Sequence, residues 1–586
     1  MTGIPEKRWF LRKPHSDRIE KLKATSVYDS LPEILVQLLA LRGITGEKEV
    51  ARFLHPRLQD LGDPFLLPDM DKAVERILLA VDRKESVVIY GDYDVDGVTS
   101  ITLLKSILLA YGLEPRTFLP HRMEEGYGIS ADGLDKCRAE GSMDLLIAVD
   151  CGTTSIAELA PLADEGTDVL IFDHHECSQA GRPNCVALVN PKAGDTYHYL
   201  CSAGVVFKLG HALLKQRWLE NFELREFLDI AALGTVADIV PLVDENRLIV
   251  RKGLLQLERT RHAGLRALRK VAGLQSPLNA MDIGFRMGPR LNASGRLASA
   301  QASLDLLMCQ DDEEAMIIAQ ELDGNNRDRQ GVEETIIREA EAQIESDLDV
   351  TSAGFVLGSE GWHPGVVGIV ASRIMRRYHR PTFVIAFDED GIGKGSGRSV
   401  HGVSLVDIIN SSRDLLLKGG GHDMAAGISI EKDKFLAFRE RFAQLVAAAA
   451  SADLFHPKLM LDVETRLTDL RPEVLDNYEL LEPFGSSNPQ PLFYARAVRP
   501  KQTPRLLKEK HLQMVLTQDD AERDAVWFSV GPVVLPKPPW DIAFYIQRTQ
   551  FRGRLRIQIL IQALRKTKAY PETVIIGAPE DPQPDL

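Results

Sequence analysis

Residues 86–97 have the sequence SVVIYGDYDVDG, in which a mostly apolar run ends directly in three alternating aspartates. The run Ser86–Tyr90 is short and lacks polar alternation, which is typical of a buried parallel strand. Gly97 and the helical pattern of Val98–Ala110 follow at once. A strand, a carboxylate-rich turn and a helix form the first half of a βαβ unit, so this stretch predicts an α/β fold with a doubly wound parallel sheet.

Three further segments end hydrophobic runs with side chains that can bind metals. They are Asp150 after Leu145–Val149, Asp173-His174-His175 after Val169–Phe172, and Asp238 after Ala237. In an open α/β sheet, ligands bind beyond the carboxyl ends of the strands, so we expect these side chains to converge on one crevice. A set of carboxylates and imidazoles suits Mn²⁺ or Mg²⁺ better than a structural zinc ion.

The aspartates of residues 92–96 have two simpler explanations. A single aspartate in such a loop is more often a helix cap, but coincidence is a poor account of four clusters at successive element ends. An EF-hand calcium loop needs a glutamate six residues after its glycine, where Leu103 stands. Carboxylates this close repel one another unless a cation neutralises them. The expected chemistry is phosphoryl-oxygen cleavage, for which two cations about 3.5–4 Å apart can activate a water.

The whole chain has the composition of an ordinary globular protein. It holds 586 residues, of which 44% are hydrophobic and 26% charged, and its formal net charge is -14. The charge argues against a protein that coats nucleic acid through overall charge. No apolar stretch approaches the ~20 residues that span a bilayer, and the amino terminus lacks a signal-peptide core, so we expect a cytoplasmic protein without a membrane partner. Six cysteines without a Cys-x-x-Cys pair favour reduced thiols.

The apolar patterns divide the chain into six parts. We expect an amino-terminal appendage over residues 1–70, the first α/β domain over 71–270, a helical connector over 271–350, a second α/β domain over 351–454, a small β-barrel over 455–570 and a disordered tail over 571–586. The connector contains a long charged helix near Asp311–Ile344, a kind of helix that often bridges domains. The barrel is expected from short strands separated by turn residues, and the tail from its prolines and acids.

The chain resembles the DHH phosphoesterase superfamily, whose four motifs match the segments that begin at Asp92, Val149, Asp173 and Ala237. Members hydrolyse phosphoric esters with Mn²⁺ or Mg²⁺. The resemblance implies two ions per active site and the metal ligands Asp92, Asp94, Asp96, Asp150, His174 and Asp238, with Asp150 bridging the ions. It implies catalytic roles for Asp96, Asp150, His174 and His175. Asp92 and His175 are either ligands or neighbours of the ligands, and Tyr90 stands where many members have a histidine.

Within the superfamily, residues 45–565 resemble bacterial exonucleases that degrade single-stranded DNA 5′→3′ in repair and recombination. By this resemblance the second α/β domain is a DHHA1 domain, which holds substrate over the metals, and the β-barrel is an OB-fold. The implied partners are single-stranded DNA, a helicase and a single-strand-binding protein, and the implied state is a monomer.

Two internal segments carry candidate substrate-binding residues. Residues 286–296 contain three arginines and no acid, and the resemblance implies DNA-backbone contacts by Arg290, Asn292 and Arg296, with a solvated connector as the alternative. In the second α/β domain the resemblance implies phosphate contacts by His363, Ser396, Arg398, Gly420, Gly421 and His422. Consecutive glycines let backbone N–H groups approach a phosphate, although a mobile turn is the simpler explanation for such a run.

The carboxy-terminal β region has the clearest local case for binding a polyanion. Residues 548–568 contain seven lysines and arginines and no acid, and Arg554 and Arg556 alternate with aliphatic side chains. This alternation places the cations on one face of a strand, as in OB-folds that hold single strands. A solvated edge strand protected by charge is the alternative.

Three functions are compatible with these features. The leading hypothesis is a metal-dependent exonuclease that hydrolyses single-stranded DNA by a two-metal mechanism. A DHH phosphodiesterase for short oligonucleotides or cyclic dinucleotides would need no extended basic track. A non-catalytic scaffold like the eukaryotic protein Cdc45 would be expected to have lost acids that this chain retains.

Overall fold

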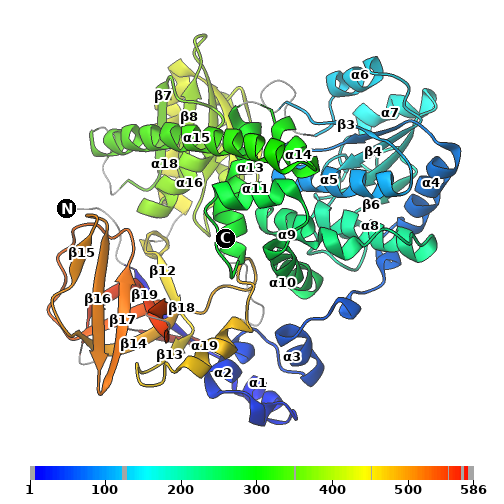
Figure 1. Ribbon diagram of the computed structural model, residues 1–586. Helices are drawn as coiled ribbons and strands as arrows, with labels where there is room; N and C mark the ends of the chain where they lie inside the picture. The colour runs from blue at the N-terminus through cyan, green and yellow to red at the C-terminus, as the bar shows by residue number, and fades with distance from the viewer. Residues whose placement is uncertain are drawn as a thin grey trace. The chain divides into compact units, whose positions relative to one another are not determined.

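The computed structural model describes residues 7–121, 128–297, 299–346, 348, 352–449, 452–551, 554–568 and 573–577. The chain separates into two compact units (Figure 1). The smaller unit consists mainly of Glu321–Leu459, and the larger of Trp9–Gly295, Ser299–Gln320 and Met460–Leu586. The predicted fold class, with a parallel sheet, a second α/β domain and a β-barrel, is confirmed.

The first α/β domain is built on a five-stranded parallel sheet in the order β3-β2-β4-β5-β6. Its strands are β2 (Val87–Tyr90), β3 (Arg116–Phe118), β4 (Leu145–Val149), β5 (Asp168–Phe172) and β6 (Ala187–Val189). The chain passes from β2 to β3 on one side and then returns to β4 on the other, so the strand order reverses between β2 and β4. Such a switch point is where open α/β sheets bind ligands.

Helices from both sides bury this sheet. Those next to the sheet are α4 (Met70–Arg83), α5 (Val95–Ala110), α6 (Ala131–Ala139), α7 (Ile156–Asp164) and α8 (Ser202–Gln216). Helix α9 (Leu228–Ala237) packs against α5, and α10 (Asp244–Glu258) packs against α9. Leu134 of α6 and Leu159 of α7 share one apolar cluster with Leu146 of β4. Helix α5 is buried along most of its length because α8 and α9 pack against it. This packing fixes the positions of the helix ends next to the sheet.

The predicted connector is helical. Helix α11 (Ala263–Val271) leads into it, and it contains α12 (Ala280–Asp282), a π-helix (Ile283–Met287), α13 (Gly288–Leu297) and α14 (Gln301–Met308). The long charged helix is confirmed as α15 (Asp312–Ser346).

The second α/β domain has a mixed sheet in the order β10-β11-β9-β8-β7. Its strands are β7 (Phe355–Glu360), β8 (Thr382–Phe387), β9 (Ile392–Arg398), β10 (Lys418–Gly421) and β11 (Ala425–Glu431). One apolar cluster joins the sheet to α17 (Leu405–Asn410) and α18 (Phe435–Ala449), and another joins it to α15 and α16 (Val367–Tyr378). The sheet is therefore covered by two separate sets of helices.

The carboxy-terminal region forms a closed five-stranded barrel. Its strands are β14 (Phe493–Pro500), β16 (His511–Gln518), β17 (Ala521–Trp527), β18 (Trp540–Phe551) and β19 (Arg554–Lys566), and β13 (Val463–Glu464) and β15 (Arg505–Leu507) extend it. The order β14-β18-β19-β17-β16 closes through pairing of β14 with β16. Only β17 and β19 are parallel among these barrel neighbours. This is the Greek-key arrangement of an OB-fold.

Both ends of the chain differ from the expected appendage and tail. Helices α1 (Ser16–Lys23), α2 (Glu33–Leu41) and α3 (Glu47–Leu54) share an apolar core with the barrel and with α19 (Pro472–Glu479). Strand β1 (Arg8–Lys13) lies between β12 (Lys458–Leu461) and β20 (Val574–Gly577). Residues 574–577 were expected to be disordered, but they pair in parallel with β1. Residues 578–586 lie outside the described part.

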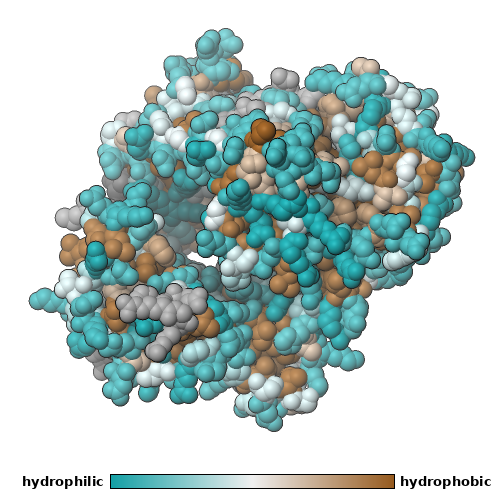
Figure 2. Space-filling view, viewed as in Figure 1, coloured by the Kyte–Doolittle hydropathy of each residue, from teal (hydrophilic) through white to brown (hydrophobic). Residues whose placement is uncertain are grey.

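The surface in Figure 2 is mainly hydrophilic, with hydrophobic residues in small patches. In the part of the chain that the structure describes, none of the helices combines the length and the apolar character needed to cross a membrane.

A buried ion pair attaches the segment before α4 to the helices of the first domain. Lys208 of α8 and Glu245 of α10 are 0% and 2% exposed, and Lys208 Nζ lies 2.9 Å from Glu245 Oε2. Lys208 also donates to the carbonyl oxygen of Gly62, and Glu245 accepts from the N–H of Gly62. Removing either charge would leave the other buried without its partner.

We expect Lys208→Met to lower the free energy of unfolding by about 3 kcal/mol, because Glu245 would stay buried without its cation. Lys215→Met is the matched control. Lys215 lies on the same helix and pairs with Asp63, but these side chains are 46% and 48% exposed, and such pairs contribute about 0–1 kcal/mol. Urea denaturation followed by circular dichroism compares the variants. Equal midpoints would contradict the structural role of the buried pair.

Candidate metal centre

A tight turn brings Asp92 and Asp94 to the end of β2. Asp94 caps α5, because its Oδ1 accepts from the N–H of Asp96 at 2.8 Å and of Gly97 at 3.1 Å. A Cβ atom at Gly97 would lie 2.3 Å from the carbonyl oxygen of Asp92, so only glycine fits. The turn places carboxylate oxygens of Asp92 and Asp94 within 4.8 Å of each other and of one from Asp150.

The amino-terminal end of α8 holds Asp96 and Asp150. The oxygens of Asp96 accept from the backbone N–H groups of Ser202 at 2.8 Å and Ala203 at 2.9 Å. The Ser202 hydroxyl donates to Asp150 Oδ1 at 2.9 Å. Donors at a helix amino terminus favour negative charge. Ser202 was not predicted, because no motif marks it in the chain.

The backbone is strained beside two of the acids. Asp150 has φ of 60° and Ile239, the neighbour of Asp238, has φ of 61°. A non-glycine residue in this region costs on the order of 1 kcal/mol, and for a β-branched residue such a φ is rare. Strained residues of this kind cluster at functional sites.

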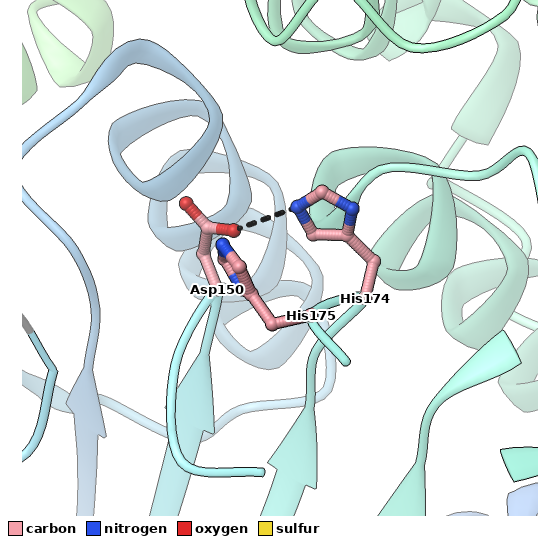
Figure 3. Close-up of side chains that lie close together, drawn as sticks. All are labelled: Asp150, His174 and His175. Atoms are coloured by element: carbon pink, nitrogen blue, oxygen red, sulfur yellow. Dashed lines mark ion pairs between the residues drawn. The ribbon is translucent and has the colours of Figure 1, made fainter. Parts of the chain in front are cut away.

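His174 completes a cluster with three acids from three elements, of which Figure 3 draws Asp150. Its Nε2 lies 3.4 Å from Asp150 Oδ1, 3.4 Å from Asp238 Oδ2 and 3.8 Å from Asp96 Oδ2. Asp238 comes from the carboxyl end of α9 rather than from a strand. Among the described residues, neither His174 Nε2 nor Asp238 Oδ2 has a hydrogen-bond partner, although both atoms are buried. Converging buried donor atoms at this spacing fit a divalent ion, whose ligand bonds are about 2.0–2.2 Å long.

His175 lies at the exposed side of this cluster, and Asp173 and Asn190 position it. Asp173 Oδ1 is 2.7 Å from His175 Nδ1, and its carboxylate also accepts from the N–H of Thr153. Asn190, after β6, donates to the carbonyl oxygen of His175. The His175 side chain is 41% exposed, and its ring points toward Asp150 in Figure 3. Asp173 belongs to the predicted Asp-His-His segment, but its role in positioning His175 was not predicted. Asn190 was not among the predicted site residues.

The buried acids of the cluster repel one another, and a bound cation would relieve this repulsion. Burial, followed by repulsion from Asp96 and the other acids, raises the pKa of Asp150 well above its usual range. Burial and the charges of Asp96 and Asp94 raise the pKa of Asp238 to about 9. Burial also raises the pKa of Asp96, although the attraction of His174 opposes this. A bound cation would remove the cost of these charges.

The two histidines are shifted in opposite directions. Burial lowers the pKa of His174, so its imidazole is neutral and available as a ligand at neutral pH. Burial opposes protonation of His175 as well, but the hydrogen bond and charge of Asp173 outweigh it and raise the pKa of His175.

The helix that carries Arg290 and Asn292 packs against the metal centre. A Cβ atom at Gly288 would lie 3.7 Å from the Cβ of Ala237, and one at Gly295 would lie 3.1 Å from the carbonyl oxygen of Tyr93. The helix thus contacts both the end of α9 and the turn of residues 91–94 that carries Asp92 and Asp94. Arg290 and Asn292 are half-buried, and Arg290 donates to the carbonyl oxygen of Arg286. The side chain of Arg296 lies outside the description.

The candidate residues of the second α/β domain form a cluster in the smaller unit. Ser396 pairs across the sheet with Gly427, which pairs with Gly420. Arg398 donates to Ser396 Oγ at 3.0 Å, and a Cβ atom at Gly368, near the start of α16, would lie 3.0 Å from the same atom. A helix amino terminus beside an arginine suits an anion.

The remaining candidates of this domain lie around the cluster. His363 Nδ1 accepts from the N–H of Gly365 at 3.0 Å, just before α16. Gly421 has φ of 142°, and a Cβ atom there would lie 2.5 Å from the carbonyl oxygen of Ala425. His422 is exposed and donates its N–H to that oxygen at 2.8 Å.

The basic stripe of the barrel is partly neutralised by acids from other elements. Ile557, Ile559 and Ile561 are buried, as the alternation predicts. Arg556, however, lies 3.3 Å from Asp524 Oδ2 of β17, and Arg548 forms an ion pair at 2.7 Å with Glu479 of α19. The side chain of Arg554 is outside the described part. Arg548 of β18 and Arg556 of β19 are therefore partly neutralised within the protein and are not both free to bind a polyanion.

The raised carboxylate pKa values predict that metal stabilises the protein more at high pH than at low pH. An unfolded aspartate loses its proton at about pH 4, whereas folded Asp238 keeps it up to a pKa of about 9. Between these values the folded protein binds more protons than the unfolded chain, so its stability without metal falls as pH rises. A divalent ion needs the deprotonated acids, so its stabilising effect grows with pH.

Thermal unfolding with Mn²⁺ and with EDTA, at about pH 6 and about pH 8, measures this effect. We expect the Mn²⁺-induced rise in Tm to be larger at the higher pH. Asp238→Asn should reduce that difference, and Asp520→Asn, at an exposed position on the barrel, should leave it unchanged. The same Mn²⁺ effect at both pH values would contradict the prediction.

Known proteins match the chain in sequence and in structure. Family models match the DHH family, N-terminal domain, at residues 86–235, the DHHA1 domain at 350–448 and the RecJ OB domain at 461–563. The chain is 35% identical to the single-stranded-DNA-specific exonuclease RecJ of Bacillus subtilis, covering 95% of this chain and 70% of the relative. It is 33% identical to RecJ of Escherichia coli, covering 94% and 98%.

A crystal structure of RecJ from Thermus thermophilus in complex with Mn²⁺ aligns with a TM-score of 0.82 at 30% identity, covering 96% of this chain and 80% of that one. A crystal structure of exonuclease RecJ bound to manganese aligns with a TM-score of 0.59 at 36% identity, covering 67% and 96%. With DHH, DHHA1 and OB domains in the same order and relatives matched over most of its length, the chain belongs to the RecJ family.

Proposed function

We propose that this chain is a metal-dependent exonuclease that hydrolyses single-stranded DNA 5′→3′ with two Mn²⁺ or Mg²⁺ ions. The observation that carries the proposal is the convergence of three carboxylates within 3.4–3.8 Å of His174 Nε2, at the switch point of the parallel sheet. Relatives named as single-stranded-DNA-specific exonucleases, and RecJ structures with Mn²⁺ and Mg²⁺, support it. The oligonucleotide phosphodiesterase and the non-catalytic scaffold gain no support from these observations.

Two groups of side chains would hold the ions. Asp92, Asp94 and Asp150 offer ligand atoms within 4.8 Å of one another, and so do Asp96, His174 and Asp238. Asp150 belongs to the first group and also faces His174 of the second, so it is suited to bridge the ions. When bound, the ions supply an activated water and neutralise charge on the phosphate oxygens.

Other side chains and backbone groups of the protein would orient the metal ligands and protonate the substrate. Ser202 and the first N–H groups of α8 hold Asp96 and Asp150 in place, so little reorganisation is needed when substrate binds. His175, held by Asp173, carries a proton more readily than an ordinary histidine. It can donate that proton to a non-bridging phosphate oxygen or to the oxygen of the leaving group.

The remaining candidates would bind the DNA backbone. Arg290 and Asn292 lie on the helix beside the centre, where they can contact phosphates. Arg398, Ser396 and the glycines of the smaller unit would bind a backbone phosphate, and the barrel would hold the strand through its basic face. We further propose a cytoplasmic monomer that works in DNA repair and recombination with a helicase and a single-strand-binding protein.

End-labelled DNA tests the activity, its strand specificity and its direction together. With Mn²⁺ or Mg²⁺, single strands labelled at the 5′ end should release the label at once in short products, and strands labelled at the 3′ end should shorten gradually. EDTA should stop both reactions, and blunt duplexes should resist. Cleavage within the strand, equal loss of duplexes, or hydrolysis in EDTA would contradict the proposal.

Asp150→Ala should lower the rate of hydrolysis by a factor on the order of 10³, because it removes charge that acts on both ions. Binding of single strands should persist, since the cationic contacts lie elsewhere. Cys151→Ala is the neighbouring control and should retain hydrolysis. Rates from single-turnover assays and Kd values from fluorescence anisotropy separate the two effects. Lost binding with retained cleavage in Asp150→Ala would contradict the assignment.

A further inference from the structure

We propose that Phe285 and Ile239 form a platform on which the bases of a single strand stack next to the metal centre. The inference rests on the proposed function, and it names the part of the substrate that this surface recognises. Phe285 lies in the π-helix and is 67% exposed, and Ile239 directly follows Asp238 and is 69% exposed. Nothing in the metal chemistry requires large apolar side chains at these positions.

Phe285 and Ile239 lie on the two segments that meet where the π-helix packs against the end of α9. A Cβ atom at Gly284 would lie 3.7 Å from Val236 Cγ1, and one at Gly288 would lie 3.7 Å from the Cβ of Ala237. Phe285 lies between these two contact points along the helix. Ile239 lies two residues beyond Ala237, and Asp238 between them reaches to 3.4 Å from His174. The exposed apolar pair is thus built on the segments that hold a predicted metal ligand.

Three unfavourable features coincide at this place. Large apolar side chains face solvent beside a polar site, the β-branched Ile239 has φ of 61°, and residues 283–287 form a π-helix. A β-branched residue at positive φ is rare, and single-turn π-helices occur frequently at functional sites. Strained residues cluster at active sites and ligand clamps, and exposed apolar groups rimmed by polar residues mark binding surfaces.

The bases are the parts of a DNA strand that suit this surface. They offer flat apolar faces, whereas the sugar-phosphate backbone is polar and charged. Arg290 lies about one helical turn beyond Phe285 and is half-buried, whereas Arg286 is held by Asp282 and by the carbonyl oxygens of Ala272 and Gly273, so Arg290 is the cation that this surface offers. Aromatic side chains next to cations are the combination with which proteins hold single strands, because stacking tolerates every base. Paired bases inside a duplex hide their faces, so this platform would also favour single strands.

Fluorescence anisotropy in EDTA, which prevents hydrolysis, tests the platform with two oligonucleotides. One is an ordinary single strand, and the other has abasic tetrahydrofuran units in place of the nucleotides near both ends. We expect Phe285→Ala to weaken binding of the ordinary strand about tenfold and to leave binding of the abasic strand unchanged. Phe285→Trp should retain the affinity, because indole also stacks. Ile239→Ser should repeat the pattern of Phe285→Ala with a smaller loss.

Trp218→Ala is the matched control. Trp218 is an aromatic side chain with 68% exposure, and it lies just beyond the carboxyl end of α8, whose amino terminus contacts the metal centre. A helix of 15 residues is about 22 Å long, so this ring is remote from the centre. Removal of the Trp218 indole should change the affinity for neither the ordinary nor the abasic strand. Circular dichroism checks that each variant is folded.

Equal losses on both strands, or no loss with Phe285→Ala, would overturn the platform. Either result leaves the proposed function intact if the wild-type protein degrades end-labelled single strands. Failure of the proposed function would instead appear as a wild-type protein that neither binds nor degrades them.

Discussion

Repulsion between buried carboxylates is the constraint that organises the larger unit. Asp96, Asp150 and Asp238 share a space too small for three uncompensated charges, and burial raises the pKa of each. The fold offsets part of this cost with the N–H groups of α8 and with His174. Each compensating group sits at the end of a different element. The packing of α5, α8 and α9 is therefore what keeps the cluster together.

The distribution of charge explains how an acidic protein can act on a polyanion. The net charge of -14 is a property of the whole chain, whereas the cations that would meet the DNA backbone are local. They lie on α13, on β9 and on the barrel, in segments with few acids of their own. A divalent ion between acids and phosphate would reverse the sign of the field where the reaction occurs. Overall charge therefore says little about the substrate of such an enzyme.

Much of the site was predictable because it lies at strand ends, which a short apolar run followed by a polar residue reveals. The convergence of Asp92, Asp94, Asp150 and His174 was predicted in this way. Ser202 and Asn190 were not, because their role depends on which helix start or neighbouring strand the fold brings to the sheet. The ion pair of Arg556 with Asp524 was missed for the same reason, since residues 548–568 contain no acid. Local sequence patterns show which side chains a segment has, but not which residues from other segments will contact them in the fold.

The pairing of β1 with β20 has a consequence for biosynthesis. Residues 10–13 pair with residues 574–577, so β1 is translated long before the strand with which it pairs. Until then the edge of β1 that β20 later covers is open to other strands. If translation ends early, while the barrel is being synthesised, the released chain lacks β20. The edge of β1 then stays uncovered and can pair with strands of other chains.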